Sequence, residues 1–174
     1  MIIDGLKEKV PEGSVVLSFD EKGKTPVKHY GGIRWQSSRK YYIPYSQKVK
    51  GIFDIFAARN VHSGERHWKF YLWKNSFIVI DFIEYLANDV YPDKDLYIIL
   101  DGWRAHTSNV FNAYVDIHPR IHPIYLPTCS SWLNDIEKDF SNVQKDVLNN
   151  SNFSSKIEAV DAISLYFENI LNSS

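Results

Sequence analysis

The chain has 174 residues, of which 44% are hydrophobic, and this is enough for one domain with its own core. No apolar run reaches the roughly 18 residues of a membrane-spanning helix, so the sequence predicts no membrane span. The single cysteine, Cys129, excludes an internal disulfide and argues against a structural zinc site, and we expect a cytoplasmic protein in a reducing compartment.

The first half of the chain predicts an antiparallel meander of strands. Residues 1–13 are expected to form a linker or a remnant of another element, because Pro11 and Gly13 end this segment. Residues 14–20 form an apolar run, which predicts a buried strand that ends at Asp20. Further strands are expected near the runs 33–36, 40–45, 51–60 and 67–73.

The second half of the chain alternates between strands and helices. Apolar spacing predicts a helix over 75–90, a strand over 95–101, a helix over 107–117, a strand over 120–127, and helices over 131–149 and 155–171. A meander followed by a βαβα pattern indicates an α/β fold, in which a mixed sheet is flanked by helices. We therefore expect residues 14–174 to form a single domain.

Positive charge is concentrated in the first third of the chain, although the net charge of the whole is −1. Residues 1–50 carry a net charge of +5, and residues 51–174 carry −6. The segment 22–50 has no acidic residue, and its basic residues are Lys22, Lys24, Lys28, Arg34, Arg39, Lys40, Lys48 and Lys50. Basic residues interleaved with aromatic ones are typical of a nucleic-acid surface, so we predict that this segment binds double-stranded DNA. A solvated hairpin with its aromatic side chains in the core is the alternative interpretation.

Three acidic residues stand where a metal site can form. Asp20 and Asp101 each close an apolar strand, and Glu137 lies in the helix predicted over 131–149. Carboxylates are the oxygen ligands that hard divalent cations prefer, and close carboxylates repel one another unless a cation neutralises them. We therefore predict a site for two Mg²⁺ or Mn²⁺ ions that supports phosphoryl transfer.

Three acidic residues of the predicted helix compete for the third position in this site. Glu137 lies at one edge of the apolar stripe of the helix, Asp135 lies at the opposite edge, and Asp139 lies nearer the stripe. Helical periodicity alone does not choose among them.

Four short segments resemble the signature blocks of DDE transposases, and most closely those of the mariner-type enzymes and their bacterial insertion-sequence relatives. These segments are FDE (19–21), LDGWRAH (100–106), YLP (125–127) and LNDIE (133–137). The resemblance covers roughly residues 14–150 and implies a ribonuclease H-like catalytic domain. It selects Glu137 as the third catalytic and metal-binding acid, beside Asp20 and Asp101.

The resemblance also implies an activity: metal-dependent cleavage of DNA strands at transposon ends, followed by their transfer to target DNA. It is compatible with a homodimer, and it implies a protein of the prokaryotic cytoplasm that associates with the nucleoid. His106 and Asn134 are expected to support the acids without binding metal. Glu21 follows Asp20 and should point to the other face of its strand, where a structural or substrate-contact role is expected.

Two departures from the family pattern keep other functions open. Gly102 stands where the family usually has Asn, and Asp135 stands where it usually has Pro. A DNA-binding remnant that has lost catalysis is therefore one alternative, and another ribonuclease H-fold nuclease is a second, against which the LNDIE block argues. About thirteen residues precede the first expected strand, too few for the helix-turn-helix region that the family normally carries. A catalytic fragment, one product of a split reading frame and a decayed copy all fit this observation.

Overall fold

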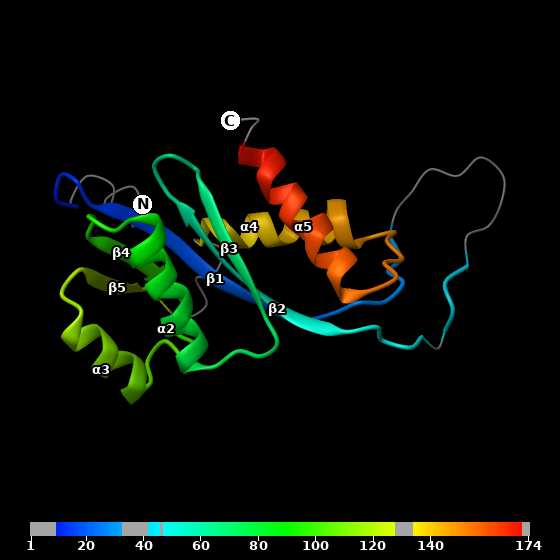
Figure 1. The fold of residues 1–174 in the computed structure, drawn as a ribbon, viewed down its shortest axis with the longest axis horizontal. Coiled ribbons are helices and arrows are strands. Elements are labelled where there is room, and N and C mark those ends of the chain that lie inside the picture. The colour runs from blue at the N-terminus through cyan, green and yellow to red at the C-terminus, as the bar shows by residue number, and fades with distance from the viewer. Residues whose placement is uncertain (1–9, 33–41, 46, 128–133, 172–174) are drawn as a thin grey trace.

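The strands form one mixed sheet (Figure 1). The computed structural model describes residues 10–32, 42–45, 47–127 and 134–171. Its strands are β1 (Val15–Pro26), β2 (Ile52–Asn60), β3 (Arg66–Tyr71), β4 (Leu96–Leu100) and β5 (Ile121–Tyr125). In this described part the sheet has the order β3-β2-β1-β4-β5. The strands β1, β2 and β3 pair antiparallel, whereas β1, β4 and β5 are parallel, which confirms a meander followed by βαβα.

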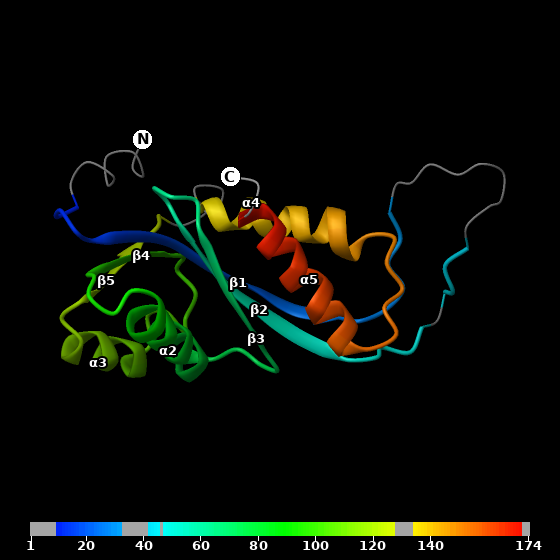
Figure 2. The ribbon, with the colours of Figure 1, turned by 45° about the horizontal axis from the view of Figure 1, so that its top comes forward.

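Helices cover both faces of the sheet (Figure 2). They are α2 (Ser76–Tyr85), continued by the π-helical turn η1 (Leu86–Val90), then α3 (Asn109–Ile117), α4 (Asp135–Asn142), continued by the π-helical turn η3 (Val143–Leu148), and α5 (Lys156–Leu171). One face of the sheet packs against α2 and α3, and the other packs against α4 and α5. Among the described residues, no helix has the length and apolar character needed to cross a membrane.

The alternation of side chains along β1 separates two hydrophobic cores. Phe19 packs against Phe82 of α2, with ring centroids 5.3 Å apart. Ala57, the partner of Asp20 on β2, packs with α4 and α5 on the opposite face. Because neighbouring residues of a strand point to opposite faces, Asp20 faces α4 and Glu21 faces α2.

The strand β1 is longer than the sequence predicts, and this corrects the position of Asp20. Asp20 lies within the strand rather than at its end, because β1 continues to Pro26. The parallel pairing with β4 stops at Ser18, whereas the antiparallel pairing with β2 goes on to Pro26 and supports the longer strand. Asp20 therefore lies just beyond the point where β1 loses its parallel neighbour.

Two further strands were expected in the segment between β1 and β2. For the run predicted near 40–45, residues 42–45 belong to no strand, and the run near 33–36 lies outside the described residues together with the rest of 33–41. Residues 1–9 of the predicted linker also lie outside them, so the domain boundary at residue 14 stays a prediction.

Of the segment that joins β1 to β2 (residues 27–51, called the arm below), the described stretches 27–32, 42–45 and 47–51 lie beyond the sheet in Figures 1 and 2. Its base is closed by two backbone hydrogen bonds, from Val27 N to Gly51 O (2.8 Å) and from Lys50 N to Val27 O (2.9 Å). Tyr30 N donates to Ser151 O (3.1 Å), which ties the arm to the segment before α5. The basic segment predicted to bind DNA thus continues from β1 into this arm.

Candidate active site

Asp20 and Asp101 lie on neighbouring strands at the same level of the sheet. The pairing of β1 with β4 ends at Ser18 and Ile99, and each aspartate lies two residues further along its chain. Asp101 directly follows β4. The two carboxylates are close enough for Asp101 to repel the charged form of Asp20. The fold thus brings the first two predicted acids together.

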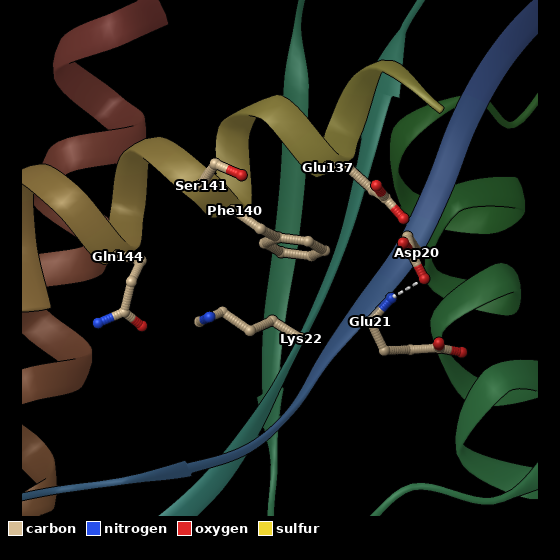
Figure 3. A pocket seen from close by; sticks show the side chains of 7 residues that line it. All are labelled: Asp20, Glu21, Lys22, Glu137, Phe140, Ser141 and Gln144. Carbon is tan, nitrogen blue, oxygen red and sulfur yellow. Dashed lines mark hydrogen bonds between the residues drawn. The ribbon is translucent and has the colours of Figure 1, made fainter. Parts of the chain in front are cut away.

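Glu137, the third predicted acid, lines the same cavity as Asp20 (Figure 3). In Figure 3 the carboxylates of Asp20 and Glu137 point toward one another, whereas the side chain of Glu21 points to the other side of β1. The cavity has a volume of about 470 Å³. It is lined by Asp20, Glu21, Lys22, Glu137, Phe140, Ser141 and Gln144.

The carboxyl group of Asp20 is strongly disfavoured in its charged form. Burial raises its pKa, a hydrogen bond from Glu21 N to Oδ1 (2.8 Å) lowers it, and repulsion by Glu21, Asp101 and Glu137 raises it again, to about 7 from the ordinary value of 3.8. A nearby cation would remove this repulsion, so the electrostatics of the carboxyl group fit a metal ligand.

The position of Glu137 depends on contacts between the start of α4 and β1. Asn134 precedes α4, is buried, and donates from Nδ2 to Phe19 O (2.8 Å). Ser18 donates from Oγ to Asn134 Oδ1 and accepts from Ile136 N (3.1 Å) at the same oxygen. The hydroxyl of Ser18 on β1 therefore accepts a hydrogen bond from a backbone N–H in the first turn of α4, a role that an N-cap side chain usually has. Our sequence reasoning missed Ser18, whose only signal was a hydroxyl within an apolar strand.

The contacts of α4 distinguish its three acidic residues. Asp139 is buried and forms a two-point ion pair with Arg66, with Oδ2 2.9 Å from Nε and Oδ1 3.1 Å from Nη2. Asp135 bonds Lys138 Nζ at 2.9 Å. Within the described residues, Glu137 has no such partner and faces the cavity. Of the three, Glu137 is the acid whose oxygens remain available for a cation.

His106 lies between two carboxylates. Its Nδ1 is 2.9 Å from Asp101 Oδ1, and its Nε2 is 2.8 Å from Glu21 Oε1. Burial lowers the pKa of His106, but the hydrogen bonds and charges of Asp101 and Glu21 outweigh it and raise the pKa to about 9 from 6.5. The hydrogen bond from His106 holds the pKa of Asp101 below its usual range, although burial opposes this shift. His106 therefore contacts both Asp101 and Glu21, and the second contact was not expected from the sequence.

The donor set of the site fits a hard divalent cation, because it consists of carboxylate oxygens. In the part of the chain that the structure describes, however, no three His, Cys, Asp or Glu side chains converge closely enough to hold one ion together. Asp20 and Glu137 face the cavity, while Asp101 is engaged by His106 and by Trp103 N (3.0 Å). Shared metal binding by all three acids stays a prediction.

The basic residues predicted to bind DNA occupy different places. Lys22 lines the cavity, and burial lowers its pKa. Lys24 is exposed on β1, while Lys28, Lys48 and Lys50 belong to the arm. Arg34, Arg39 and Lys40 lie outside the described residues. Their role in DNA binding stays a prediction.

Comparisons with known proteins agree on one family and fold. A sequence profile of the family described as DDE superfamily endonuclease matches residues 15–159. The Mos1 transposase paired-end complex with left transposon end is similar in structure, with a TM-score of 0.68, 11% identity, and 96% of this chain and 52% of that chain covered. The Mos1 mariner paired-end complex with Mn has a TM-score of 0.67 and 12% identity, over 97% of this chain and 52% of that one.

A third similar structure is an intasome of simian T-cell lymphotropic virus, with a TM-score of 0.57 and 11% identity, over 89% of this chain and 51% of that one. The mixed sheet and its flanking helices are thus a ribonuclease H-like fold. The chain spans about half the length of each of these three proteins. No curated protein sequence matched this chain.

Proposed function

Because the chain belongs to the DDE superfamily endonucleases, we propose that it is the catalytic domain of a transposase, which cleaves DNA strands at transposon ends and transfers them to target DNA. One observation carries this proposal: acids from β1 and from the first turn of α4 line one cavity, and the acid at the end of β4 is close enough to repel the one on β1. A sheet that brings carboxylates from separate segments into one place is what metal-dependent phosphoryl transfer requires.

We propose that Asp20, Asp101 and Glu137 hold two Mg²⁺ or Mn²⁺ ions. Support comes from the oxygen donor set, from the raised pKa of Asp20, and from the Mn named with one of the Mos1 complexes. When bound, the ions supply a water activated for attack on a phosphodiester and stabilise the charge that develops on the leaving 3′ oxygen. Of the two oxygens of Asp101, Oδ2 is the one that would take part, because both hydrogen bonds of the carboxylate, from His106 and from Trp103 N, fall on Oδ1.

The residues around the three acids have distinct roles in this proposal. His106 and the backbone N–H of Trp103 orient Asp101. Ser18 and Asn134 fix the first turn of α4 against β1 and so set the distance between Glu137 and Asp20. Lys22, on the same face of β1 as Asp20, places a cation in the cavity where a DNA phosphate would enter.

The proposed substrate is double-stranded DNA, both at the transposon ends and at the target. The complexes of Mos1 with a transposon end support a DNA partner for this chain. A homodimer is proposed for the assembled form, because two ends must be cut and joined together. Since its substrate is cellular DNA, we expect the protein to act in the cytoplasm, at the nucleoid of a prokaryotic cell.

A DNA-binding remnant that has lost catalysis is the competing function. Gly102 and Asp135, which depart from the family pattern, favour it, and so does the lack of three converging acids among the described residues. The fold would then keep a DNA surface without cleavage.

A nicking assay separates the two functions. The wild-type chain should nick labelled duplex DNA in Mn²⁺ but not in EDTA, and Asp101→Ala or Glu137→Gln should abolish nicking. The melting temperature of Glu137→Gln should hold or rise, because repulsion among the acids is relieved, whereas that of Asp101→Ala should fall, because the buried His106 loses a hydrogen-bond partner. The matched control is Asp135→Asn on the same helix, which should keep full activity. Wild-type DNA binding without nicking would favour the remnant, and cleavage confined to an RNA–DNA hybrid would indicate another ribonuclease H-fold nuclease.

A further inference from the structure

Glu21 is a buried carboxylate for which neither catalysis nor core packing gives a reason. Its side chain is 2% exposed and points to the α2 side of β1, away from the cavity between Asp20 and Glu137 (Figure 3). Both of its oxygens have partners, since Oε1 lies 2.8 Å from His106 Nε2 and Oε2 lies 4.0 Å from Lys74 Nζ. Burying a charged group is costly even when it is paired, so a gain in stability is a weak explanation for this arrangement.

The second contact of His106, to Asp101, indicates a role for Glu21. The same imidazole ring bonds Asp101 Oδ1 through Nδ1 at 2.9 Å, so the ring joins the two carboxylates directly. Phe19, Trp103 and Phe111 surround the ring, with centroids 5.6, 5.3 and 6.4 Å away. With both nitrogens bonded and the ring enclosed by aromatic side chains, His106 cannot rotate without breaking one of its bonds.

Asp101 is consequently constrained at one oxygen only. Its Oδ1 accepts from His106 Nδ1 and from Trp103 N, at 2.9 and 3.0 Å. Within the described residues, its Oδ2 has no hydrogen bond, and the side chain is 39% exposed. The constraint on Oδ1 therefore decides where Oδ2 points.

We propose that Glu21 is a positioning residue: through His106 it fixes the Asp101 carboxylate so that Oδ2 is presented to the divalent cation. This inference rests on the proposed metal-dependent function. Groups that orient metal ligands without touching the metal typically change metal affinity or activity by about 10–100-fold when they are removed. Glu21 itself does not bind the metal, because its side chain lies on the opposite face of β1.

The experiment measures Mn²⁺ affinity by calorimetry in the absence of DNA, together with the nicking rate and the melting temperature. Glu21→Met removes the acceptor but keeps the length of the side chain, so we expect Mn²⁺ affinity to fall about 10-fold or more. Glu21→Gln keeps an oxygen that can accept from His106 Nε2, so we expect a smaller loss. A high Mn²⁺ concentration should restore nicking by Glu21→Met but not by Asp101→Ala. DNA affinity without metal should not change.

The matched control is Glu65→Met. Glu65 directly precedes β3 and also lies beside a histidine, with Oε1 3.6 Å from His67 Nε2, but it is outside the site and its side chain is 48% exposed. We expect wild-type Mn²⁺ affinity for this variant. If Glu21→Met fails to fold, Glu21→Met/His106→Phe replaces both buried polar partners with apolar groups of similar shape, which proteins tolerate better than one unpaired partner. The double variant should also lose Mn²⁺ affinity about 10-fold or more.

The outcomes separate this inference from the proposed function. If the wild type binds Mn²⁺ and nicks DNA while a folded Glu21→Met or the folded double variant binds Mn²⁺ equally well, the positioning role is overturned and the proposed function stands. If Glu21→Met lowers only the melting temperature, its role is structural and the inference is again wrong. If the wild type neither binds Mn²⁺ nor nicks DNA, the proposed function is overturned and the positioning role falls with it.

Discussion

Asp20 shares its surroundings with three other carboxylates, from Glu21, Asp101 and Glu137. Two of these three are compensated locally, because His106 contacts both Glu21 and Asp101. The repulsion of Asp20 by Glu21 is the largest of the three, followed by that of Asp101 and then that of Glu137. Glu137 is the one that His106 does not contact, and its carboxylate points toward that of Asp20 (Figure 3). A divalent cation bound by Asp20 and Glu137 would neutralise the part of the site that His106 does not compensate.

The raised pKa of Asp20 predicts a pH dependence of the metal-free protein. Between about pH 4 and 7 the folded chain keeps a proton that the unfolded chain has lost, so its free energy of unfolding should fall as the pH rises through this window. Asp20→Asn lacks this titration, and its melting temperature in EDTA should exceed that of the wild type by a margin that grows from pH 4 to 7. A margin independent of pH would contradict the shift. Mg²⁺ at pH 7.5 should then stabilise the wild type more than the variant.

Gly102 offers a direct test of whether its departure from the family pattern has cost activity. A Cβ added there would meet no heavy atom within 4 Å, and the backbone φ lies outside the left-handed region that favours glycine. We expect Gly102→Asn to fold at least as stably as the wild type, since replacing glycine at a compatible position stabilises by about 0.4–1 kcal/mol. If the amide contributes to catalysis in the family, the nicking rate should rise several-fold, whereas Gly102→Ala should gain stability alone. Equal nicking rates in the wild type, Gly102→Asn and Gly102→Ala would show that glycine at position 102 has not cost activity.

At the scale of elements, the position of α4 is set by polar contacts to the sheet at two places along the helix. Near its start, Ser18 and Asn134 connect the helix to β1, and further along Arg66 of β3 pairs with Asp139. Arg59 of β2 lies 3.8 Å from the same carboxylate. These contacts fix the helix that carries Glu137 against the strand that carries Asp20.

The buried pair of Arg66 and Asp139 should matter for stability rather than for chemistry. Asp139→Leu leaves Arg66 buried without its carboxylate, and we expect the free energy of unfolding to fall by about 3 kcal/mol in urea titrations. Asp139→Leu/Arg66→Met removes both charges and should recover most of that loss. A single variant as stable as the wild type, or a double variant as unstable as the single one, would show that the pair does not support α4.

At the scale of the whole molecule, the arm and the acidic site carry opposite charge. The arm includes the exposed Lys48 and Lys50, whereas the cavity is bordered by Asp20 and Glu137. A phosphate backbone bound along the arm would be attracted there and repelled near the acids until a cation is present. DNA affinity and catalysis are therefore expected to depend on different parts of the chain.

Salt dependence tests the arm as the DNA surface. Lys48→Gln/Lys50→Gln should weaken binding to every duplex and reduce the slope of log K against log salt by about 1.8, because about two phosphate contacts are lost. Lys94→Gln/Lys145→Gln, which removes two exposed lysines outside the arm, is the charge-matched control and should change the slope less. Equal slopes for the two double variants would place the DNA on another surface.

The sequence by itself determined the fold class, the order of most elements and the candidate acids. Apolar runs and helical spacing are local signals, and they predicted the strands before and after residue 75 and the helix that carries Glu137. The end of β1 was predicted wrongly, because its length depends on pairing with β2 and not on the apolar run that stops at Asp20.

Only the tertiary structure decided which polar groups meet. Glu21 and His106 are 85 residues apart in sequence, Arg66 and Asp139 are 73 apart, and Ser18 and Asn134 are 116 apart. No periodicity links residues at such distances, because their contact depends on how the sheet and its helices pack. The ion pair that engages Asp139, and the contact that joins Glu21 to Asp101, therefore become visible only in the folded chain.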